Sequence, residues 1–373
     1  MKNLFFFIFI FSSGIFLYAC KKSNNGSDDA ARQEMISRLQ AVTDSFVNNS
    51  EVPGAVALVA DKKLGIDWLY KTGISDIPNN LPMEFDHIFR IGSNTKTMTG
   101  TVLLQLVDEG FVKLSDTLSK YFPQYPKADS VTIRMLCNMT SGIVSYSDDS
   151  TFSAMMKANP TMVWLPHELA EIGLSHKFHH VPGTSFLYSN TNTVLLGMLI
   201  EQLTGHTLEY EITNRIINPL GLTSTGFITS GIELPGSHGR GYYEGTYVEG
   251  QERTEYYDVS WAWAAGAAYS TPKELQKYVE ALVGGGLISD TLQHRRTTEF
   301  FQNPYNPKMG YGLCIYHLGS FMGHNGGIPG FTSSMYHSLE KNCTVIIYFN
   351  SQLELTPDNL FLRYMDILYK GNY

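Results

Sequence analysis

Hydrophobic residues form short runs of strand type near both ends of the chain. Two such runs, separated by the polar stretch from Asp61 to Gly65, make up AVALVADKKLGIDWLYKTG at residues 55–73 and predict a β-hairpin. Near the other end, strand patterns occur in YGLCIYHLG, SFMGHNGG, FTSSMYHS and CTVIIYFN, and a last helix is expected after Pro357. Strands at both termini with helices between them predict an α+β fold. We expect one antiparallel sheet, built from N- and C-terminal segments and flanked by helices.

The middle of the chain has helical periodicity instead. The pattern predicts a helix that ends at Gly205 in TNTVLLGMLIEQLTG, whereas residues 225–258 are loop-rich, with many glycines and tyrosines. We therefore expect one globular domain, residues 36–373, made of two lobes. The α/β lobe takes residues 36–100 and 265–373, and a mostly helical lobe takes residues 101–264.

The first nineteen residues do not belong to this domain. A basic start at Lys2 and then an apolar run give MKNLFFFIFIFSSGIFLYA, residues 1–19, the pattern of a secretory signal. The ending Leu17-Tyr18-Ala19-Cys20 resembles a bacterial lipobox, which predicts lipidation of Cys20 and a lipid anchor to the cell envelope. An uncleaved membrane anchor is the alternative, and it also places the domain outside the cytoplasm, in the periplasm or at the cell surface. Residues 20–35 are polar and rich in Ser and Asn, as expected of a flexible tether.

Composition and charge exclude one class of partner. Of 373 residues, 27 are Lys or Arg and 35 are Asp or Glu, which gives a net charge of −8. Basic residues cluster only at Lys21-Lys22, so we expect no nucleic-acid partner. Since 43% of the residues are hydrophobic, the chain can bury a sizeable core. We expect the domain to act as a monomer.

Cysteines and histidines give no metal or redox motif. Besides Cys20, the cysteines are Cys137, Cys314 and Cys343, and three cannot all pair within one chain. We expect buried reduced thiols, with a Cys314–Cys343 bridge as the alternative. A histidine cluster is a candidate metal site, but it lacks His-Glu-x-x-His, and we expect no metal and no cofactor. Its members are His167, His176, His179 and His180. Gly-x-Ser-x-Gly, which an α/β-hydrolase would carry, is absent too.

A serine and a lysine stand one helical turn apart in FRIGSNTKTMTGTVLLQLVDEG, residues 89–110. The apolar positions predict a strand that runs into an amphipathic helix, with Ser93 and Lys96 at the helix start. Residues at i and i+3 share a face, so Lys96 can accept the Ser93 proton if burial, nearby cations and the helix dipole lower its pKa. The backbone N–H of Ser93 is then a candidate oxyanion donor. The alternative is an N-cap serine.

The same Ser-x-x-Lys pattern occurs twice more, with structural interpretations. Ser270 and Lys273 surround a proline and fit the cap and first turn of a helix. Ser338 and Lys341 fit a turn between two strands. The motif alone therefore does not distinguish Ser93.

A second candidate is Tyr188-Ser189-Asn190, which follows a Pro-Gly turn and precedes a helical pattern. The phenol of Tyr188 can relay a proton if nearby positive charge lowers its pKa, which is ~10 when unperturbed. Asn190 either presents its amide to a peptide-like substrate or caps the following helix. Tyr348-Phe349-Asn350 fits the same template, but it lies in an apolar strand, where the tyrosine is expected in the core.

A third candidate is His324-Asn325-Gly326-Gly327, in GHNGGIPGF. Small residues after the histidine would let a substrate backbone lie along the strand edge. The N–H of Gly327 would be the natural second oxyanion donor. The alternative is a structural histidine in a glycine turn.

The order of the three motifs is more specific than any one of them. Ser-x-x-Lys, then Tyr-x-Asn, then His-x-Gly-Gly resembles the serine β-lactamase and penicillin-binding superfamily, with similar flanks over most of residues 50–350. The resemblance is closest to the D-alanyl-D-alanine carboxypeptidases related to class C β-lactamases, in which a histidine replaces the lysine of Lys-Thr-Gly. It implies an exported serine hydrolase that acts by acyl-enzyme on a small peptide, β-lactam or ester. Alternatives are an esterase or D-amino-acid amidase of the same fold, or a sensor that binds without turnover.

The resemblance also implies roles for single residues. The implied catalytic residues are Ser93, Lys96, Tyr188 and His324, with the backbone N–H groups of Ser93 and Gly327 as the oxyanion hole. The implied substrate-binding residues are Asn190, Asn325, Gly326 and, in VSWAWAAGAAYSTPKEL, Trp261.

One departure from the family pattern bears on the substrate. The carboxypeptidases hold a terminal carboxylate with an arginine and threonines near the third motif, but YGLCIYHLGSFMGHNGG has no arginine. We therefore expect amides, esters or blocked D-peptides to be preferred, because an unpaired carboxylate would lose hydration without compensation. A protonated His324 would favour carboxylates only toward acidic pH. Arg240 and Lys308 are the other candidate cations.

Overall fold

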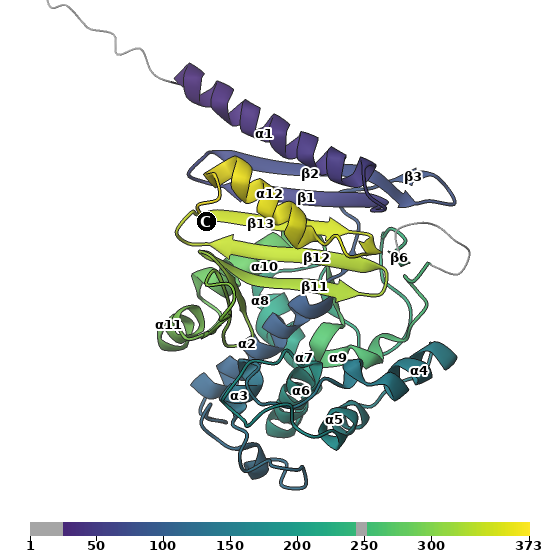
Figure 1. Ribbon diagram of the computed structural model, residues 1–373, viewed down its shortest axis with the longest axis vertical. Coiled ribbons are helices and arrows are strands. Elements are labelled where there is room, and N and C mark those ends of the chain that lie inside the picture. Colours follow the sequence, from purple (N-terminus) through teal and green to yellow (C-terminus); the bar gives the residue numbers. More distant parts are fainter. Residues whose placement is uncertain (1–24, 244–251) are drawn as a thin grey trace, which may run out of the picture.

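The computed structural model describes residues 25–243 and 252–373. Within these residues the largest sheet has nine strands, each antiparallel to its neighbours (Figure 1). Its strands, in spatial order, are β3 Leu81–Pro82, β2 Ile66–Asp76, β1 Gly54–Asp61, β13 Cys343–Phe349, β12 Phe331–Ser338, β11 Phe321–Ile328, β10 Tyr316–Leu318, β9 Met309–Tyr311 and β8 Phe301–Gln302.

The two ends of the chain meet inside this sheet. Strand β1 pairs with β2 through the predicted hairpin turn, and its other edge pairs with β13. The register with β13 runs from Ala55 opposite Phe349 to Asp61 opposite Cys343. The prediction of an antiparallel sheet built from N- and C-terminal segments is therefore confirmed.

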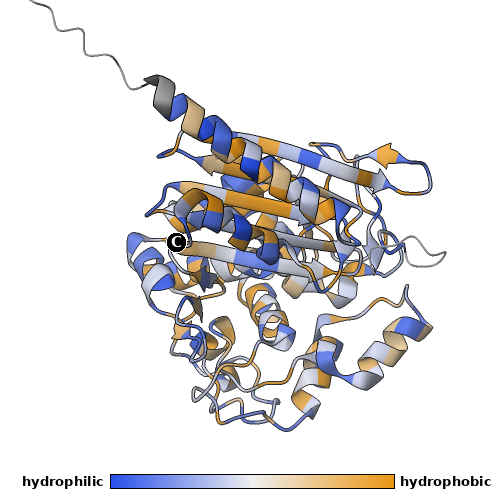
Figure 2. Cartoon of the chain, turned by 45° about the horizontal axis from the view of Figure 1, so that its top comes forward, coloured by the Kyte–Doolittle hydropathy of each residue, from blue (hydrophilic) through white to orange (hydrophobic). Residues whose placement is uncertain are grey.

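Helices cover both faces of the sheet. On one face lie α1 Asn25–Asn48 and α12 Pro357–Tyr369, which begins at the predicted proline (Figure 1). On the other face lies α10 Pro272–Gly284, and α11 Asp290–Thr298 follows it in the chain. Side chains alternate along a strand, so the two faces of β1 belong to two separate hydrophobic clusters. Figure 2 shows hydrophobic residues along the strands beneath the more polar α1 and α12.

The N-terminal helix contradicts part of the predicted tether. The expectation of a flexible segment over residues 20–35 is wrong from Asn25 onward, because α1 begins there. Its first turns are polar but contain good helix formers such as Ala30 and Ala31. Its later turns bury Leu39 and Val47 against the sheet, and this tertiary packing stabilises a helix that polarity alone does not reveal. The predicted signal at residues 1–19 and Cys20 lie outside the described residues.

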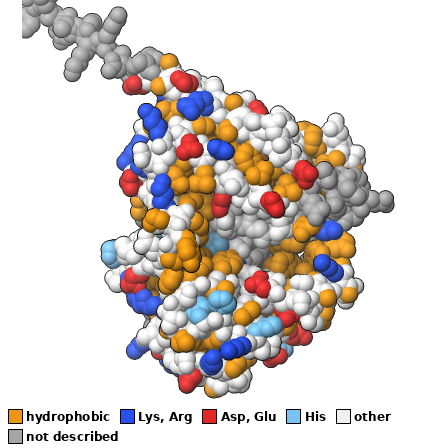
Figure 3. Space-filling model, viewed as in Figure 1, with side chains coloured by type: hydrophobic (Ala, Val, Ile, Leu, Met, Phe, Trp, Pro, Cys, Tyr) orange, Lys and Arg blue, Asp and Glu red, His pale blue; other side chains and the backbone are white. Residues whose placement is uncertain are grey.

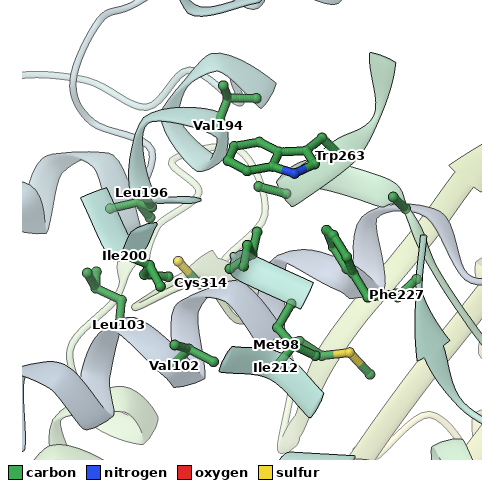
Figure 4. Close-up of a cluster of buried hydrophobic side chains, with 14 of the residues drawn as sticks. Met98, Val102, Leu103, Val194, Leu196, Ile200, Ile212, Phe227, Trp263 and Cys314 are labelled. Carbon is green, nitrogen blue, oxygen red and sulfur yellow. The ribbon is translucent and has the colours of Figure 1, made fainter. Parts of the chain in front are cut away.

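The helical lobe is built around α2 Thr95–Asp108 and α6 Asn190–Thr204. Helix α6 ends at Gly205, which has φ +74°, as predicted. These two helices pack against α9 Trp263–Gly266, and Figure 4 shows Met98, Val194 and Trp263 within their shared cluster. The other helices of this lobe are α3 Ile133–Cys137, α4 Ser150–Ala158, α5 Pro166–Ser175, α7 Leu208–Ile212 and α8 Asn218–Leu220. A sheet with flanking helices beside a helical lobe confirms the predicted α+β class.

Short elements complete the chain. A three-stranded sheet has the order β4 Phe89–Arg90, β7 Ala268–Ser270 and β5 Gly226–Phe227. Strand β14 Ser351–Gln352 pairs in parallel with β6 Tyr242–Tyr243. The single-turn elements are η1 Gly92–Asn94, η2 Leu118–Lys120, η3 Tyr146–Asp148, the π-helical η4 Thr213–Ile217 and η5 Val259–Trp261.

The cysteines of the described chain are buried and unbridged. Cys137, Cys314 and Cys343 are all free thiols, so the expectation of buried reduced cysteines is confirmed and the alternative Cys314–Cys343 bridge is not formed. Among the helices described, none has both the length and the apolar composition needed to cross a membrane.

Candidate active site

Ser93 lies in the tight turn that connects β4 to α2. The 3₁₀ turn η1 holds Ser93, and the α-helix starts only at Thr95, two residues later than the sequence predicts. Gly92 has φ +52°, a conformation that favours glycine. The half-buried Ser93 hydroxyl accepts a hydrogen bond from Lys96 and does not cap α2, so the N-cap interpretation is wrong.

Lys96 lies in the first turn of α2, fully buried. Its Nζ lies 2.9 Å from Ser93 Oγ and 2.8 Å from the carbonyl oxygen of Ala265. Burial lowers the pKa of Lys96 from its usual 10.5 to about 7. The direction agrees with the prediction, and of the causes expected from the sequence it is burial that lowers this pKa, without a contribution from neighbouring cations. Lys96 is therefore poised to exchange a proton with Ser93 near neutral pH.

Tyr188 lies in the extended segment directly before α6, with its ring against Lys96. The Nζ of Lys96 lies 5.0 Å from the centre of the Tyr188 ring. Burial raises the pKa of Tyr188 well above its usual 10, although a hydrogen bond with Ser93 acts in the opposite direction. The condition that nearby positive charge lowers this pKa is therefore not met, because the cost of burying a phenolate dominates. Tyr188 is protonated at neutral pH.

His324 lies on β11 and is almost fully buried beside Tyr188. The centres of the two rings are 6.1 Å apart. His324 Nδ1 lies 2.5 Å from the carbonyl oxygen of Asn325, which can only accept, so the proton is on Nδ1. Nε2 then accepts a hydrogen bond from the Tyr311 hydroxyl at 3.1 Å.

This environment also sets the charge of His324. Burial, and secondarily the charge of Lys96, lowers the pKa of His324 from 6.5 to about 3. The expectation that His324 becomes a carboxylate-binding cation at mildly acidic pH is therefore wrong. Neither of the other candidate cations is near the site: Arg240 binds Asp76, and Lys308 Nζ binds the carbonyl oxygen of Gly371.

The two glycines after His324 bring β11 against the turn that carries Ser93. A methyl group on Gly326 would lie 2.0 Å from the carbonyl oxygen of Ile91, so Gly326 permits this close approach. A methyl group on Gly92 would lie 2.8 Å from the amide nitrogen of Gly327. The backbone of Gly327 therefore lies beside the residue that precedes Ser93, where its N–H can assist that of Ser93.

The structure directs the predicted binding residue Asn325 away from the site. Its Nδ2 donates to Asp358 Oδ2 at 2.6 Å, so the side chain binds the first turn of α12. Alternation along β11 separates it from His324, which faces the helical lobe. Substrate binding by the Asn325 side chain is therefore not supported. Gly326 likewise has a packing role.

A narrow cavity of about 30 Å³ brings four of the predicted residues together. Ser93, Asn190, Trp261 and Gly327 line it, together with Tyr146, Ala262, Ala265, Gly266 and Ile328. Asn190 does not cap α6: its Nδ2 donates to Ser147 Oγ at 2.9 Å, and its buried Oδ1 has no partner among the described residues. Figure 3 shows a hollow between the two lobes, with hydrophobic side chains on its rim. Asn190 thus lines this cavity with an amide oxygen that no described residue satisfies.

A family model identifies the fold that holds these residues. The model described as Beta-lactamase matches residues 39–366. The chain belongs to the Beta-lactamase family. This confirms the resemblance to the serine β-lactamase and penicillin-binding superfamily.

Similar proteins of the family include solved structures that match nearly the whole chain. A D-stereospecific amidohydrolase from Streptomyces sp. is 29% identical, with a TM-score of 0.80 over 90% of this chain and 98% of that chain. The D-amino acid amidase from Ochrobactrum anthropi SV3, complexed with L-phenylalanine amide, is 27% identical, with a TM-score of 0.79 over 91% and 100%. Protein flp of Staphylococcus aureus (strain NCTC 8325 / PS 47) is 30% identical over 198 residues, which are 51% of this chain and 38% of that protein. The chain thus spans well under half the length of that relative.

The competing copies of the motifs lie away from this family site. Ser270 ends β7, and Thr271, not Ser270, caps α10 ahead of its proline. Ser338 and Lys341 lie at the turn between β12 and β13, and Tyr348 is buried in β13. Among the described residues no group of histidines, cysteines and carboxylates could hold a metal, and His176 instead binds Asp149.

Three residues near the site were not predicted from the sequence. Tyr311 supports His324, but only the pairing of β9, β10 and β11 brings them together. Arg90 and Arg253 line a cavity of about 10 Å³ that shares Trp261 and Ile328 with the Ser93 cavity. Burial lowers the pKa of Arg90 only to about 10, so it is charged at neutral pH. Its position three residues before Ser93 was the available signal.

Proposed function

We propose that this protein hydrolyses amide or ester bonds through an acyl-enzyme formed at Ser93. The observation that carries the proposal is the 2.9 Å hydrogen bond between Lys96 Nζ and Ser93 Oγ, made by a buried lysine whose pKa is about 7. Near neutral pH a large fraction of such a lysine is uncharged and can accept the serine proton.

In the proposed acylation, Lys96 takes the proton of Ser93 as Ser93 Oγ attacks the substrate carbonyl carbon. The N–H groups of Ser93 and Gly327 stabilise the oxyanion, and the amide of Asn190 orients the acyl part. The bond from the carbonyl carbon to the leaving group then breaks. The leaving group takes a proton from Tyr188, which the raised pKa keeps protonated, and Lys96 returns its proton to Tyr188. Water attacks the ester in the second half-reaction and regenerates Ser93.

Charge around the site favours substrates that lack a free carboxylate on the leaving group. Among the described residues that line the Ser93 cavity there is no lysine or arginine, and His324 is neutral. Arg90 and Arg253 line a separate small cavity, and neither Ser93 nor Tyr188 is among its described lining residues. A carboxylate beside Tyr188 would therefore lose hydration without an ion pair.

We accordingly propose D-amino-acid amides and C-terminally blocked D-peptides as the substrate class. The similarity to the D-stereospecific amidohydrolase and the D-amino acid amidase over most of the chain supports this choice. A D-alanyl-D-alanine carboxypeptidase, which the sequence resemblance favours, would need a cation on the side of Tyr188. One copy of the chain supplies every proposed catalytic residue, so the proposed mechanism needs no second subunit.

The test is a panel of matched donors. We compare kcat/KM between pH 5 and 8 for six donors. They are D-phenylalanine amide and its L enantiomer, a D-Ala-D-Ala peptide and its C-terminal amide, nitrocefin and an aryl ester. We expect the blocked donors to be preferred at every pH, since the pKa of His324 lies below this window. A strong preference for the free acid would instead establish a carboxypeptidase.

The acyl-enzyme itself is tested by labelling. The protein is treated with a fluorescent penicillin or phosphonate, and the labelled peptide is mapped by mass spectrometry. Label on Ser93, lost in Ser93→Ala, supports the proposal; label on another serine, or none with any probe, contradicts it.

Export and lipid anchoring remain proposals from the sequence. The apolar start and the Leu17-Tyr18-Ala19-Cys20 ending support a lipoprotein of the bacterial cell envelope. Incorporation of a radiolabelled fatty acid in the full-length chain, abolished in Cys20→Ala, is the expected result. Equal labelling of the two would refute lipidation at Cys20.

A further inference from the structure

A second, larger cavity lies on the Tyr188 side of the site. Its volume is about 400 Å³, within the range of ~300–1,000 Å³ that small-molecule sites occupy. Three parts of the chain form it: the segment before Tyr188, the β8–β9 turn, and strands β9 and β10. Half of its ten described lining residues are aromatic, and the residues that matter here are Phe186, Phe301, Tyr305, Met309, Tyr311 and Tyr316.

Tyr311 connects this aromatic cavity to the catalytic residues. Its hydroxyl donates to His324 at 3.1 Å, and its ring lies edge-on to that of Tyr188, with centres 6.1 Å apart. Phe186, two residues before Tyr188, packs on the same Tyr311 ring at 5.9 Å. The wall of the cavity is therefore also the support of Tyr188 and His324.

The lining of the cavity carries no charge. No lysine, arginine, aspartate or glutamate is among its described residues, and its polar groups are hydroxyls and one asparagine amide. Such a surface binds an aromatic or branched apolar group and leaves a carboxylate unpaired. The Ser93 cavity, at about 30 Å³, has no comparable room.

The proposed reaction determines which part of the substrate the aromatic cavity would bind. In acylation the carbonyl carbon bonds to Ser93 Oγ, the bond to the leaving nitrogen breaks, and that nitrogen takes the proton from Tyr188. The leaving group must therefore lie beside Tyr188, whereas the acyl group stays with Ser93, Asn190 and Trp261. We propose that the aromatic cavity binds the leaving group, so that the enzyme prefers amides of aryl or large apolar amines. This inference rests on the proposed acyl-enzyme mechanism.

A series of amides with one acyl group tests the inference. The D-phenylalanyl methylamide, benzylamide and naphthylmethylamide all give the same acyl-enzyme, so only acylation can differ between them. We expect kcat/KM to rise about tenfold or more from methylamide to benzylamide, since the cavity would bury the additional aromatic ring. The deacylation rate, measured after a rapid acylation, is expected to be equal for all three.

Variants locate the effect in this cavity. Tyr305 is 95% exposed, so Tyr305→Ala removes a wall of the cavity without opening the core. We expect it to lower the benzylamide-to-methylamide ratio roughly threefold or more. Tyr210→Ala is the matched control, because Tyr210 is an exposed tyrosine of α7 that does not line the cavity, and the ratio should not change. Phe186→Ala should lower the ratio further.

The outcomes separate this inference from the proposed function. If Ser93 is acylated but all three amides react at one rate, the leaving-group site is refuted and the proposed function stands. If Tyr305→Ala changes deacylation as much as acylation, the cavity binds the acyl side and the inference is equally refuted. If no acyl-enzyme forms at Ser93, both fail together.

Discussion

Lys96 Nζ lies 2.9 Å from Ser93 Oγ at the end of a fully buried side chain. Because this burial lowers the pKa of Lys96 to about 7, the lysine loses its proton in the physiological range. We expect kcat/KM for an amide or ester to rise with pH through an apparent pKa near 7. No falling limb from Tyr188 is expected below pH 10, because the pKa of Tyr188 is raised. A pH–rate profile from pH 5 to 10 checks both, and a profile that falls above pH 7 would contradict this assignment.

The same burial has a consequence for stability. The pKa of Lys96 is about 7 in the folded protein and 10.5 in the unfolded chain, so the unfolded chain binds one more proton between these values. The free energy of unfolding therefore decreases as pH falls from 10.5 toward 7, and it increases again as pH rises toward 10.5. We expect inactive Lys96→Met to unfold at higher urea concentration than the wild type at pH 7, with a difference that shrinks by pH 10. Parallel pH curves for the two proteins would contradict the lowered pKa.

Tyr188 offers a test of the direction of proton flow. Tyr188→Phe keeps the ring against Lys96 but removes the proton for the leaving group. We expect kcat/KM for amides to fall by ~10²–10⁴-fold, the usual contribution of a general acid. An activated aryl ester, whose leaving group needs little protonation, should lose far less. Stopped-flow acylation with the two donors measures the contrast, and equal losses would mean that Tyr188 acts on Ser93 instead.

The sequence predicts which residues meet at the site but not their environment. Their spacing within one helical turn predicts that Ser93 and Lys96 are neighbours. The order of the three motifs predicts that Tyr188 and His324 belong to the same site. Their protonation depends on burial, which long-range packing determines: β9 brings Tyr311 to His324, and α9 brings the Ala265 carbonyl to Lys96. This is why the condition on the pKa of Tyr188 is not met.

The fold shows the same division between local and long-range information. Strand patterns at both termini predict the sheet, because each strand carries its own alternation or apolar run. The first turns of α1 have no such pattern, and they become helical through the packing of Leu39 and Val47 further along. The direction of the Asn325 side chain depends on Asp358 of α12, 33 residues away.

His324 makes the protein sensitive to acid. Its pKa is about 3 in the folded protein and ~6.5 when unfolded, so stability is complete above pH 6.5 and is lost as pH falls toward 3. His324→Gln retains a side chain that can hydrogen-bond Tyr311 but does not titrate. From pH 6.5 to 4, we expect the free energy of unfolding to fall less steeply for this variant than for the wild type. The two slopes should differ by about 1.4 kcal/mol per pH unit. Urea unfolding over this range measures the slopes, and above pH 6.5 the slopes of the two proteins should agree. Equal slopes below 6.5 would show that His324 is not buried as described.

Adjacent glycines of β11 provide the sharpest test of how the site is assembled. A methyl group on Gly326 would lie 2.0 Å from the carbonyl oxygen of Ile91, a backbone atom that cannot rotate away. One on Gly327 would have no neighbour closer than 3.8 Å. We therefore expect Gly326→Ala to displace β11 from the Ser93 turn, destabilise the protein by about 3 kcal/mol or more, and slow penicillin labelling at least 100-fold. Gly327→Ala should retain the wild-type Tm, because it keeps the N–H and its methyl group makes only ordinary van der Waals contacts. Thermal unfolding and labelling rates of the two variants are compared directly. If Gly326→Ala kept both the wild-type Tm and the labelling rate, β11 could not pack against Ile91 as closely as the structure places it.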